Sequence, residues 1–231
     1  QGNTGDARAF DGISFDGVDD NVEVASTASL NISDYLTIET WVNIDASATG
    51  DNFFTLFKMA SNEGLNLSVQ DLGEDGNYRF RMEADTDAGR LRVDSESVMA
   101  AGSWHHLVGV IDSVTNTASV YVDGVKSGRF DIDFDNIEFT NSAIQLGDKL
   151  PGSMDETRMY HRALGDAEVV EHYNNIFINN RELALYLPMD EHQYDITRDL
   201  SGNANNGVLA NGADWATSST EESEFLFHVD N

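Results

Sequence analysis

The chain has 231 residues, a length that fits one large domain, and its 41 acidic and 13 basic residues give a formal charge of -28 at pH 7. This charge argues against nucleic acid and anionic membrane surfaces as partners, because both attract clustered Lys and Arg. The absence of cysteine excludes disulfides, thiolate metal sites and cysteine nucleophiles, and it favours a bacterial exported protein. No apolar run approaches the roughly 20 residues that span a bilayer, so membrane insertion is not expected.

The acidity has two compatible explanations. A strongly charged surface keeps a protein soluble, and carboxylate oxygens are the ligands that Ca²⁺ requires. The first residues, Gln1 to Gly5, read like linker sequence. We therefore expect neighbouring domains in a larger chain.

A period-two alternation of side chains predicts strands along most of the chain. Between residues 36 and 44, the even-numbered residues face one side, and Thr37, Glu39, Trp41 and Asn43 face the other. Further strands are expected at residues 65–69, 78–82, 104–112, 117–122, 144–147 and 154–160. Short strands of this kind, with no long helical pattern between them, indicate an all-β sandwich.

Two local signals predict a turn and a helix between or after these strands. Asp123-Gly124 predicts a tight turn after the strand at residues 117–122. Residues 167–173 predict the one short helix, with Asp166 as its N-terminal cap.

Several short motifs occur in a characteristic order, at residues 14–24 (SFDGVDDNVEV), 36–42 (LTIETWV), 104–108 (WHHLV), 120–124 (VYVDG) and 152–160 (GSMDETRMY). Together they resemble the laminin G-like and pentraxin type of concanavalin A-like jelly roll. The resemblance implies a sandwich of two antiparallel sheets with one short helix. It defines the fold better than the function, because this fold hosts lectins, adhesion modules, enzyme-appended binding modules and some glycosidases.

The resemblance also suggests how the chain is organised. We assign residues 1–175 to the jelly-roll core and residues 176–231 to a C-terminal segment. Parts of that segment, at 183–191 and 199–207, resemble sequence that precedes the Phe-Asp-Gly motif in this family, although here they follow the core. The segment either folds back to supply the first strands of the same sandwich or begins the next repeat. Fold-back is favoured, because unpaired strands would expose edges.

The first candidate metal ligands are Asp16, Gly17 and Asp19. A glycine-containing turn can direct backbone carbonyls and adjacent carboxylates at one point, as Ca²⁺ requires. The second candidate is Asp155, because the resemblance implies that an Asp at this place holds a structural calcium together with carbonyls from the start of the fold. Strict alternation would place Asp155 on the opposite face from Arg158. The alternative is that Asp16 and Asp19 cap a tight turn and that Asp155 pairs with a backbone group.

A further oxygen-rich set comprises Asp190, Asp199, Asn203 and Asn206. A polar turn is the favoured interpretation of this set, and additional calcium ligands are the alternative. Asp133, Asp135 and Glu138 resemble the alternating carboxylates of retaining β-glucanases with this fold. Glu138 would not share their face without a bulge, so catalysis is not expected.

Trp41 is the candidate for contacting a ligand. If its face of the sheet is open, the indole could stack on a sugar ring; otherwise it is covered by packing. We therefore expect a non-catalytic binding or adhesion module, secreted or on the cell surface, that binds a glycan or a protein ligand and carries structural Ca²⁺. The alternative is a calcium-stiffened structural or protein-binding domain of a large adhesin. A glycosidase or polysaccharide lyase is least favoured.

Overall fold

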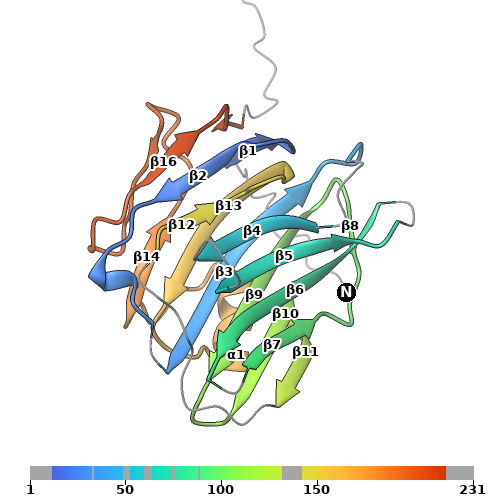
Figure 1. The fold of residues 1–231 in the computed structure, drawn as a ribbon, viewed down its shortest axis with the longest axis vertical. Helices are drawn as coiled ribbons and strands as arrows, with labels where there is room; N and C mark the ends of the chain where they lie inside the picture. Colours follow the sequence, from blue (N-terminus) through green and yellow to red (C-terminus); the bar gives the residue numbers. More distant parts are fainter. Residues whose placement is uncertain are drawn as a thin grey trace, which may run out of the picture.

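The computed structural model describes residues 12–32, 34–48, 53–59, 64–73, 76–87, 89–131 and 142–216. Two sheets lie face to face (Figure 1). In spatial order, the first contains β11 (Val125–Asp131), β10 (Thr117–Val122), β9 (Trp104–Asp112), β3 (Tyr35–Ile44), β13 (Pro151–Tyr160), β1 (Ile13–Asp16) and β17 (Asp214–Trp215), and β14 (Leu183–Leu187) also pairs with β13. The second contains β15 (Ile196–Thr197), β16 (Gly207–Ala210), β2 (Asn21–Val24), β12 (Ile144–Leu146), β4 (Phe53–Met59), β5 (Leu65–Asp71), β6 (Asn77–Thr86) and β7 (Gly89–Asp94), and β8 (Met99–Ala100) pairs with β6.

Within the described residues, each strand pairing is antiparallel. The predicted all-β sandwich of two antiparallel sheets with one short α-helix is therefore confirmed. A single 3-10 turn, η1 (Ala28–Leu30), precedes β3 in the described part of the chain. None of the described helices is long and apolar enough to cross a membrane.

The core lies between the sheets and follows the predicted alternation. On β3, the side chains of Leu36, Ile38, Val42 and Ile44 join a continuous cluster of buried apolar residues. The Asp123-Gly124 turn is also confirmed, because φ is +52° and +78° at these two residues. Positive φ at both central positions gives the turn a twist that matches the right-handed twist of β10 and β11.

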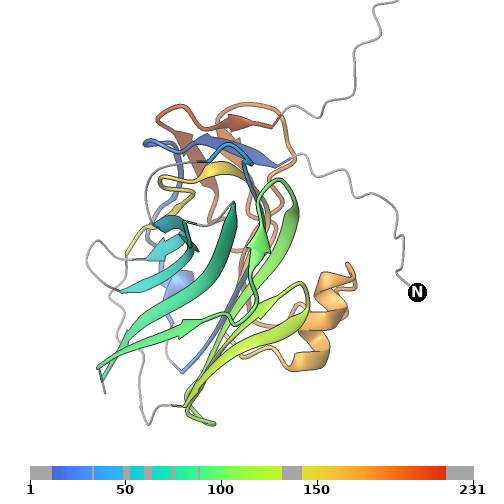
Figure 2. The ribbon, with the colours of Figure 1, turned by 90° about the vertical axis from the view of Figure 1, so that its right-hand side faces the viewer.

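The helix α1 (Asp166–Tyr173) covers the outer face of the first sheet. Figure 2 shows it on the side of β9 and β10 that faces away from the other sheet. Beneath it, a second apolar cluster contains Val108, Val110, Tyr121, Tyr160, Leu164 and Val169. The outer face of this sheet is therefore buried where the helix lies.

The predicted cap of this helix was wrong. The N-cap is Gly165, whose backbone N–H donates to the Glu168 carboxylate at 3.1 Å. Asp166 lies inside the first turn of the helix and contacts the first sheet instead. Its carboxylate accepts from the Tyr121 hydroxyl and pairs with Lys126, both at 2.7 Å.

Strands late in the chain lie beside strands from its beginning. Along one edge of β13, β1 pairs with the first half, at Met154, and β14 pairs with the second half, at Met159. In addition, β16 pairs with β2 and β17 pairs with β1. Figure 1 shows the orange and red C-terminal strands next to the blue N-terminal ones. Residues 183–215 thus contribute strands to both sheets.

Candidate functional site

The turn between β1 and β2 gathers three carboxylates. It carries the chain from the first sheet to the second, and it bends at Gly17, where φ is +81°. Glycine adopts this conformation without steric cost. As a result, carboxylate oxygens of Asp16, Asp19 and Asp20 all lie within 4.8 Å of one another.

Hydrogen bonds within the turn fix two of these carboxylates. Asp16 Oδ1 accepts from the backbone N–H of Val18, and Asp20 Oδ2 accepts from that of Asp16, both at 2.8 Å. Asp16 and Asp19 are exposed, whereas Asp20 is only 4% exposed. Among the described residues, nothing donates a hydrogen bond to the buried Asp20 Oδ1. A buried carboxylate oxygen without a partner is costly, and a bound cation would satisfy it.

The electrostatics of the turn also favour a bound cation. Burial raises the pKa of the Asp20 carboxyl; the Asp16 N–H opposes this rise, and the charges of Asp16 and Asp19 reinforce it. A folded chain without a metal therefore carries three mutually repelling carboxylates here. An all-oxygen donor set of this kind suits a hard divalent cation such as Ca²⁺.

The turn between β16 and β17 packs against this cluster. Asn211 Nδ2 donates to the backbone oxygen of Asp19 at 3.1 Å. A Cβ placed on Gly212 would lie 2.7 Å from Asp20 Oδ1, so the glycine backbone passes directly over the buried oxygen. Two segments almost 200 residues apart thus enclose the cluster.

The structure brings Asp16 and Asp19 together around the Gly17 turn and adds Asp20, which belongs to the predicted turn but was not assigned as a ligand. The available signal was the alternation of β2. Val22 and Val24 point inward, so Asp20, two residues before Val22, points inward as well.

Asp155 lies apart from this cluster. The register places Asp16 opposite Pro151, and four residues at about 3.3 Å each put Asp155 roughly 13 Å further along β13. Ca²⁺ binds oxygen at about 2.3–2.6 Å, so one ion cannot bind both residues. Asp155 is 6% exposed, and its backbone oxygen accepts from Thr40 Oγ1 at 3.3 Å. Any metal at Asp155 belongs to a separate site, which stays a prediction.

Strict alternation along β13, which would place Asp155 and Arg158 on opposite faces, was wrong. The pairing of β13 with β3 shifts register between Asp155 and Arg158, and Glu156 has φ of +57°. This bulge inserts one residue, so Asp155 and Arg158 both lie on the outer face, opposite Trp41 and Glu39.

Trp41 lies on the outer face, under the helix. Its indole is 8% exposed, stacks on Tyr173 with the ring centroids 5.7 Å apart, and lies 5.2 Å from His106. This arrangement corresponds to the packed alternative, so the indole offers little surface to a sugar.

The oxygen-rich set of the C-terminal segment forms a hydrogen-bonded turn. The Asp199 carboxylate accepts from the backbone N–H groups of Tyr186, Ser201 and Asn205 and from the Ser201 hydroxyl, at 2.8–2.9 Å. Asn206 Oδ1 accepts from the Asp199 N–H at 2.9 Å. These bonds use the acceptors of Asp199 to hold the turn on β14, as the polar-turn interpretation predicts. Asp133, Asp135 and Glu138 lie outside the described residues.

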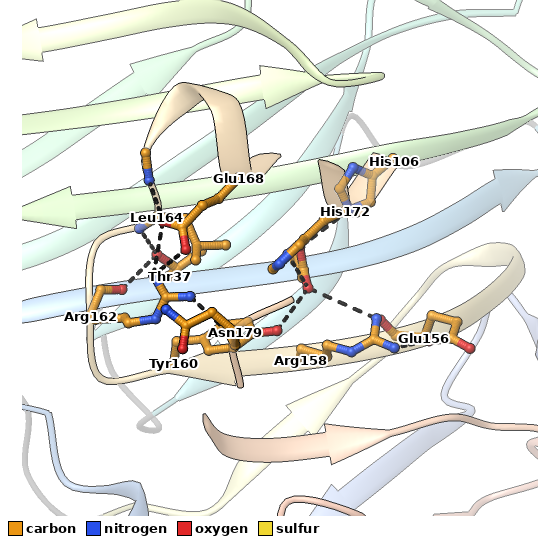
Figure 3. Close-up of polar contacts among 12 residues, drawn as sticks. Thr37, His106, Glu156, Arg158, Tyr160, Arg162, Leu164, Glu168, His172 and Asn179 are labelled. Atoms are coloured by element: carbon orange, nitrogen blue, oxygen red, sulfur yellow. Dashed lines mark hydrogen bonds and ion pairs between the residues drawn. The ribbon is translucent and has the colours of Figure 1, made fainter. Parts of the chain in front are cut away.

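A buried ionic cluster lies beneath the helix (Figure 3). At its centre is the fully buried Glu39, whose carboxylate contacts His172 Nδ1 at 2.9 Å, His106 Nε2 at 3.4 Å and Arg158 Nη1 at 3.9 Å. Burial favours a raised pKa for Glu39, but hydrogen bonds from the two histidines outweigh it and hold that pKa far below its usual range. The cluster ties the helix to β3.

Arg158 extends this cluster toward the C-terminal segment. Its guanidinium lies between the rings of Phe177 and Tyr186, 4.0 Å and 3.9 Å from their centroids, and also pairs with Glu156. With a side chain only 5% exposed, Arg158 is a structural cation rather than part of an open site.

Residues 16–170 match the family model Laminin_G_3, described as concanavalin A-like lectin/glucanases superfamily. No curated protein matches the chain in sequence.

Three solved structures illustrate the similarity in fold. A protein from Bacteroides ovatus, described as carbohydrate-binding, has a TM-score of 0.67 and 18% identity, over 90% of this chain and 59% of that one. The heptameric SAP-like pentraxin of Limulus polyphemus has a TM-score of 0.54 and 12% identity, over 89% of this chain and 98% of that one. The binding domain of Paraclostridial Mosquitocidal Protein 1 has a TM-score of 0.53 and 21% identity, over 69% and 42%. The chain therefore spans about 59% of the length of the Bacteroides protein, and these identities show the shared fold alone.

Proposed function

Because the chain belongs to the laminin G-like family of the concanavalin A-like lectin/glucanases superfamily, we propose that it is a non-catalytic, extracellular binding module for a glycan. The similarity to a Bacteroides protein described as carbohydrate-binding, over 90% of this chain, supports the proposal. We further propose that residues 1–175 and 176–231 form one folding unit within a larger bacterial surface or secreted protein. The pairing of β14, β16 and β17 with early strands supports this assignment.

The observation that carries the calcium part of the proposal is the buried, unpartnered oxygen of Asp20 in the β1–β2 turn. We propose that Asp16, Asp19 and Asp20 hold one Ca²⁺ ion, with carbonyl oxygens of the turn as further ligands. The ion would neutralise the repulsion among the three carboxylates. It would also stabilise the contact between this turn and the turn at Asn211 and Gly212.

We propose no catalytic role for this chain. A general acid or base must lie within hydrogen-bonding reach of the substrate. Asp20 and Glu39 both have shifted pKa values, but Asp20 is 4% exposed and Glu39 is fully buried. Their environments suit a metal ligand and a structural anion.

Substituting Asp20→Asn tests the metal site. In millimolar Ca²⁺ the native chain is expected to melt roughly 5–11 °C higher than in EDTA, if the ion is present at about 100 times its dissociation constant. Asp20→Asn is expected to melt at or above the native temperature in EDTA, because it removes a buried and repelled charge, and to show no rise with Ca²⁺. Scanning calorimetry measures both temperatures. The exposed Asp34→Asn is the matched control and should keep the full calcium shift.

An equal calcium shift in native and Asp20→Asn chains would rule out this cluster as the site. A calcium shift that depends on Asp20, in a protein that binds no glycan, would instead favour a calcium-stiffened structural or protein-binding domain.

The calcium shift is also expected to depend on pH. The folded-state pKa of Asp20 is raised, so in EDTA the stability linked to this group is present below its unfolded pKa of about 3.9 and is lost as pH rises through the folded pKa. Ca²⁺ binds the ionised form, and protons therefore compete with it at low pH. Melts at pH 7 and pH 4 should give a larger calcium shift at pH 7. A shift that is larger at pH 4 would contradict the assignment of Asp20 as a ligand.

A further inference from the structure

The loop between β14 and β15 holds an aromatic ring in solvent on a strained backbone. Met189, His192 and Tyr194 have φ of +60°, +48° and +63°, a region that side chains with a Cβ seldom adopt. Tyr194 is also 79% exposed, so burial of its ring does not offset the strain. Such strain persists where the surrounding structure imposes it, and it is concentrated at functional sites.

Contacts to the sheets impose this conformation. The Trp215 indole N–H donates to the backbone oxygen of Tyr194 at 2.9 Å, and the Trp215 ring lies 5.6 Å from that of His192. On the other side, the Leu209 N–H donates to the backbone oxygen of Asp195 at 2.9 Å. Since Trp215 and Leu209 belong to β17 and β16, the exposed ring is presented by the sandwich itself.

A cavity of about 290 Å³ lies beside this loop. Its lining combines an aromatic ring, an aliphatic side chain, hydrogen-bond donors and hydrogen-bond acceptors, supplied by Glu191, Gln193, Tyr194, Ile196 and Arg198. Ligand sites in proteins combine apolar and aromatic side chains with a few placed polar groups in the same way, at volumes from about 300 Å³ upward. The size suits one sugar residue rather than a long groove.

Glu191 retains acceptor capacity at this cavity. Its Oε1 accepts from the Arg198 N–H at 2.5 Å, which fixes the carboxylate in place. Its Oε2 is buried and, among the described residues, receives no hydrogen bond. Rotation of the Glu191 side chain toward the cavity would let a ligand hydroxyl supply the missing donor, and a buried acceptor left unpaired is unfavourable.

We propose that this cavity, the Tyr194 pocket, binds one neutral sugar residue and is the place where the module contacts its glycan. The inference rests on the proposed glycan-binding function and adds the site and the sugar class. The Tyr194 ring offers a flat apolar surface to the C–H face of a sugar, while Gln193, Arg198 and Glu191 meet its hydroxyls. A neutral sugar is favoured because Glu191 and Arg198 offset each other's charge within the pocket, and the chain as a whole, at -28, repels anions.

The test uses the full chain in Ca²⁺ on a printed array of neutral and acidic glycans. The native protein is expected to bind neutral glycans, and Tyr194→Gly is expected to lose at least 90% of that signal. Because glycine adopts φ of +63° readily, Tyr194→Gly should melt at the native temperature or up to about 4 °C above it. A residue with a merely structural role would lower the melting temperature. Phe130→Ala, which removes an exposed ring from β11, is the matched control and should bind as the native chain does.

Each other outcome would contradict a specific part of the proposal. Retained binding by Tyr194→Gly would overturn the pocket and leave the glycan-binding function standing. No binding of the native chain to any glycan would overturn both. Binding confined to acidic glycans would overturn the neutral class. A lower melting temperature for Tyr194→Gly would show that the ring stabilises the loop, which contradicts its assignment as a ligand contact.

Discussion

A chain that ends at Arg181 is expected to show no cooperative unfolding transition. The truncation removes β14, β16 and β17, which pair with strands earlier in the chain, and β15, which pairs with β16. It leaves the second half of one edge of β13, one edge of β1 and one edge of β2 without partners. Open edges of this kind also promote association between chains.

The loss of burial explains the size of this effect. Leu185, Leu187, Met189 and Leu209 are each at most 7% exposed and belong to the main core. Burying each such side chain contributes about 1.5–3 kcal/mol, so the four together contribute roughly 6–12 kcal/mol. A domain is stable by only about 5–15 kcal/mol in total, so the truncated chain has little or no stability left.

Circular dichroism, recorded during heating and during urea titration, measures the unfolding transition and tests this prediction. A peptide of residues 182–216 added in trans should restore a transition, because the missing strands can pair again. Within the full chain, Leu187→Ala should cost about 2–5 kcal/mol. The half-exposed Val208→Ala is the control and should change stability by no more than about 0.5 kcal/mol. A truncated chain that melts cooperatively near the native temperature would contradict the assignment of residues 176–231 to the same folding unit.

Local periodicity was enough to predict most of the fold. Alternation between residues 36 and 44 separated the core face of β3 from its outer face, because neighbouring side chains in a strand point to opposite sides. The Asp123-Gly124 pair predicted its turn for an equally local reason, the ease with which these residues adopt positive φ.

Features that depend on distant residues were not accessible in this way. The bulge in β13 placed Arg158 on the same face as Asp155, and a bulge is set by pairing with another strand. Asp166 was assigned as the helix cap because Asp is a preferred N-cap residue. Its actual partners, Tyr121 and Lys126, lie some 40 residues away and leave no local signal. The strain at Tyr194 likewise follows from a bond to Trp215, and a single-residue pattern contains no sign of it.

The cluster around Glu39 also depends on residues distant in the sequence, and it leads to a second prediction with a large expected effect. Alternation predicted that Glu39 lies on the outer face of the sheet, and it does, but it is fully buried there. The helix covers it, and His172 of that helix lies 133 residues later in the sequence. Breaking a buried ion pair by removing one partner costs about 3–5 kcal/mol, since the other partner stays buried and uncompensated. Glu39→Gln is therefore expected to lower the melting temperature by roughly 6–20 °C, at about 2–4 °C per kcal/mol.

The effect of pH gives this prediction a specific signature. The folded-state pKa of Glu39 is depressed, so its contribution is present above the unfolded value of about 4.3 and is lost as pH falls through the folded value. The difference between native and Glu39→Gln chains should thus be full at pH 6 and should shrink below about pH 4. Glu23→Gln, on the exposed side of β2, is the matched control and should leave both the melting temperature and its pH dependence unchanged.

A double substitution separates charge pairing from simple space filling. If the cost of Glu39→Gln arises from the polar groups left unpaired, then Glu39→Met combined with His172→Leu should recover part of the stability, because apolar side chains of similar volume often replace buried ionic groups without loss. Recovery is incomplete because His106 Nε2 still loses its carboxylate partner. Arg158 keeps Glu156 as its partner in that variant. Equal losses in the single and double variants would contradict an ionic origin and would indicate that shape alone holds the helix on β3.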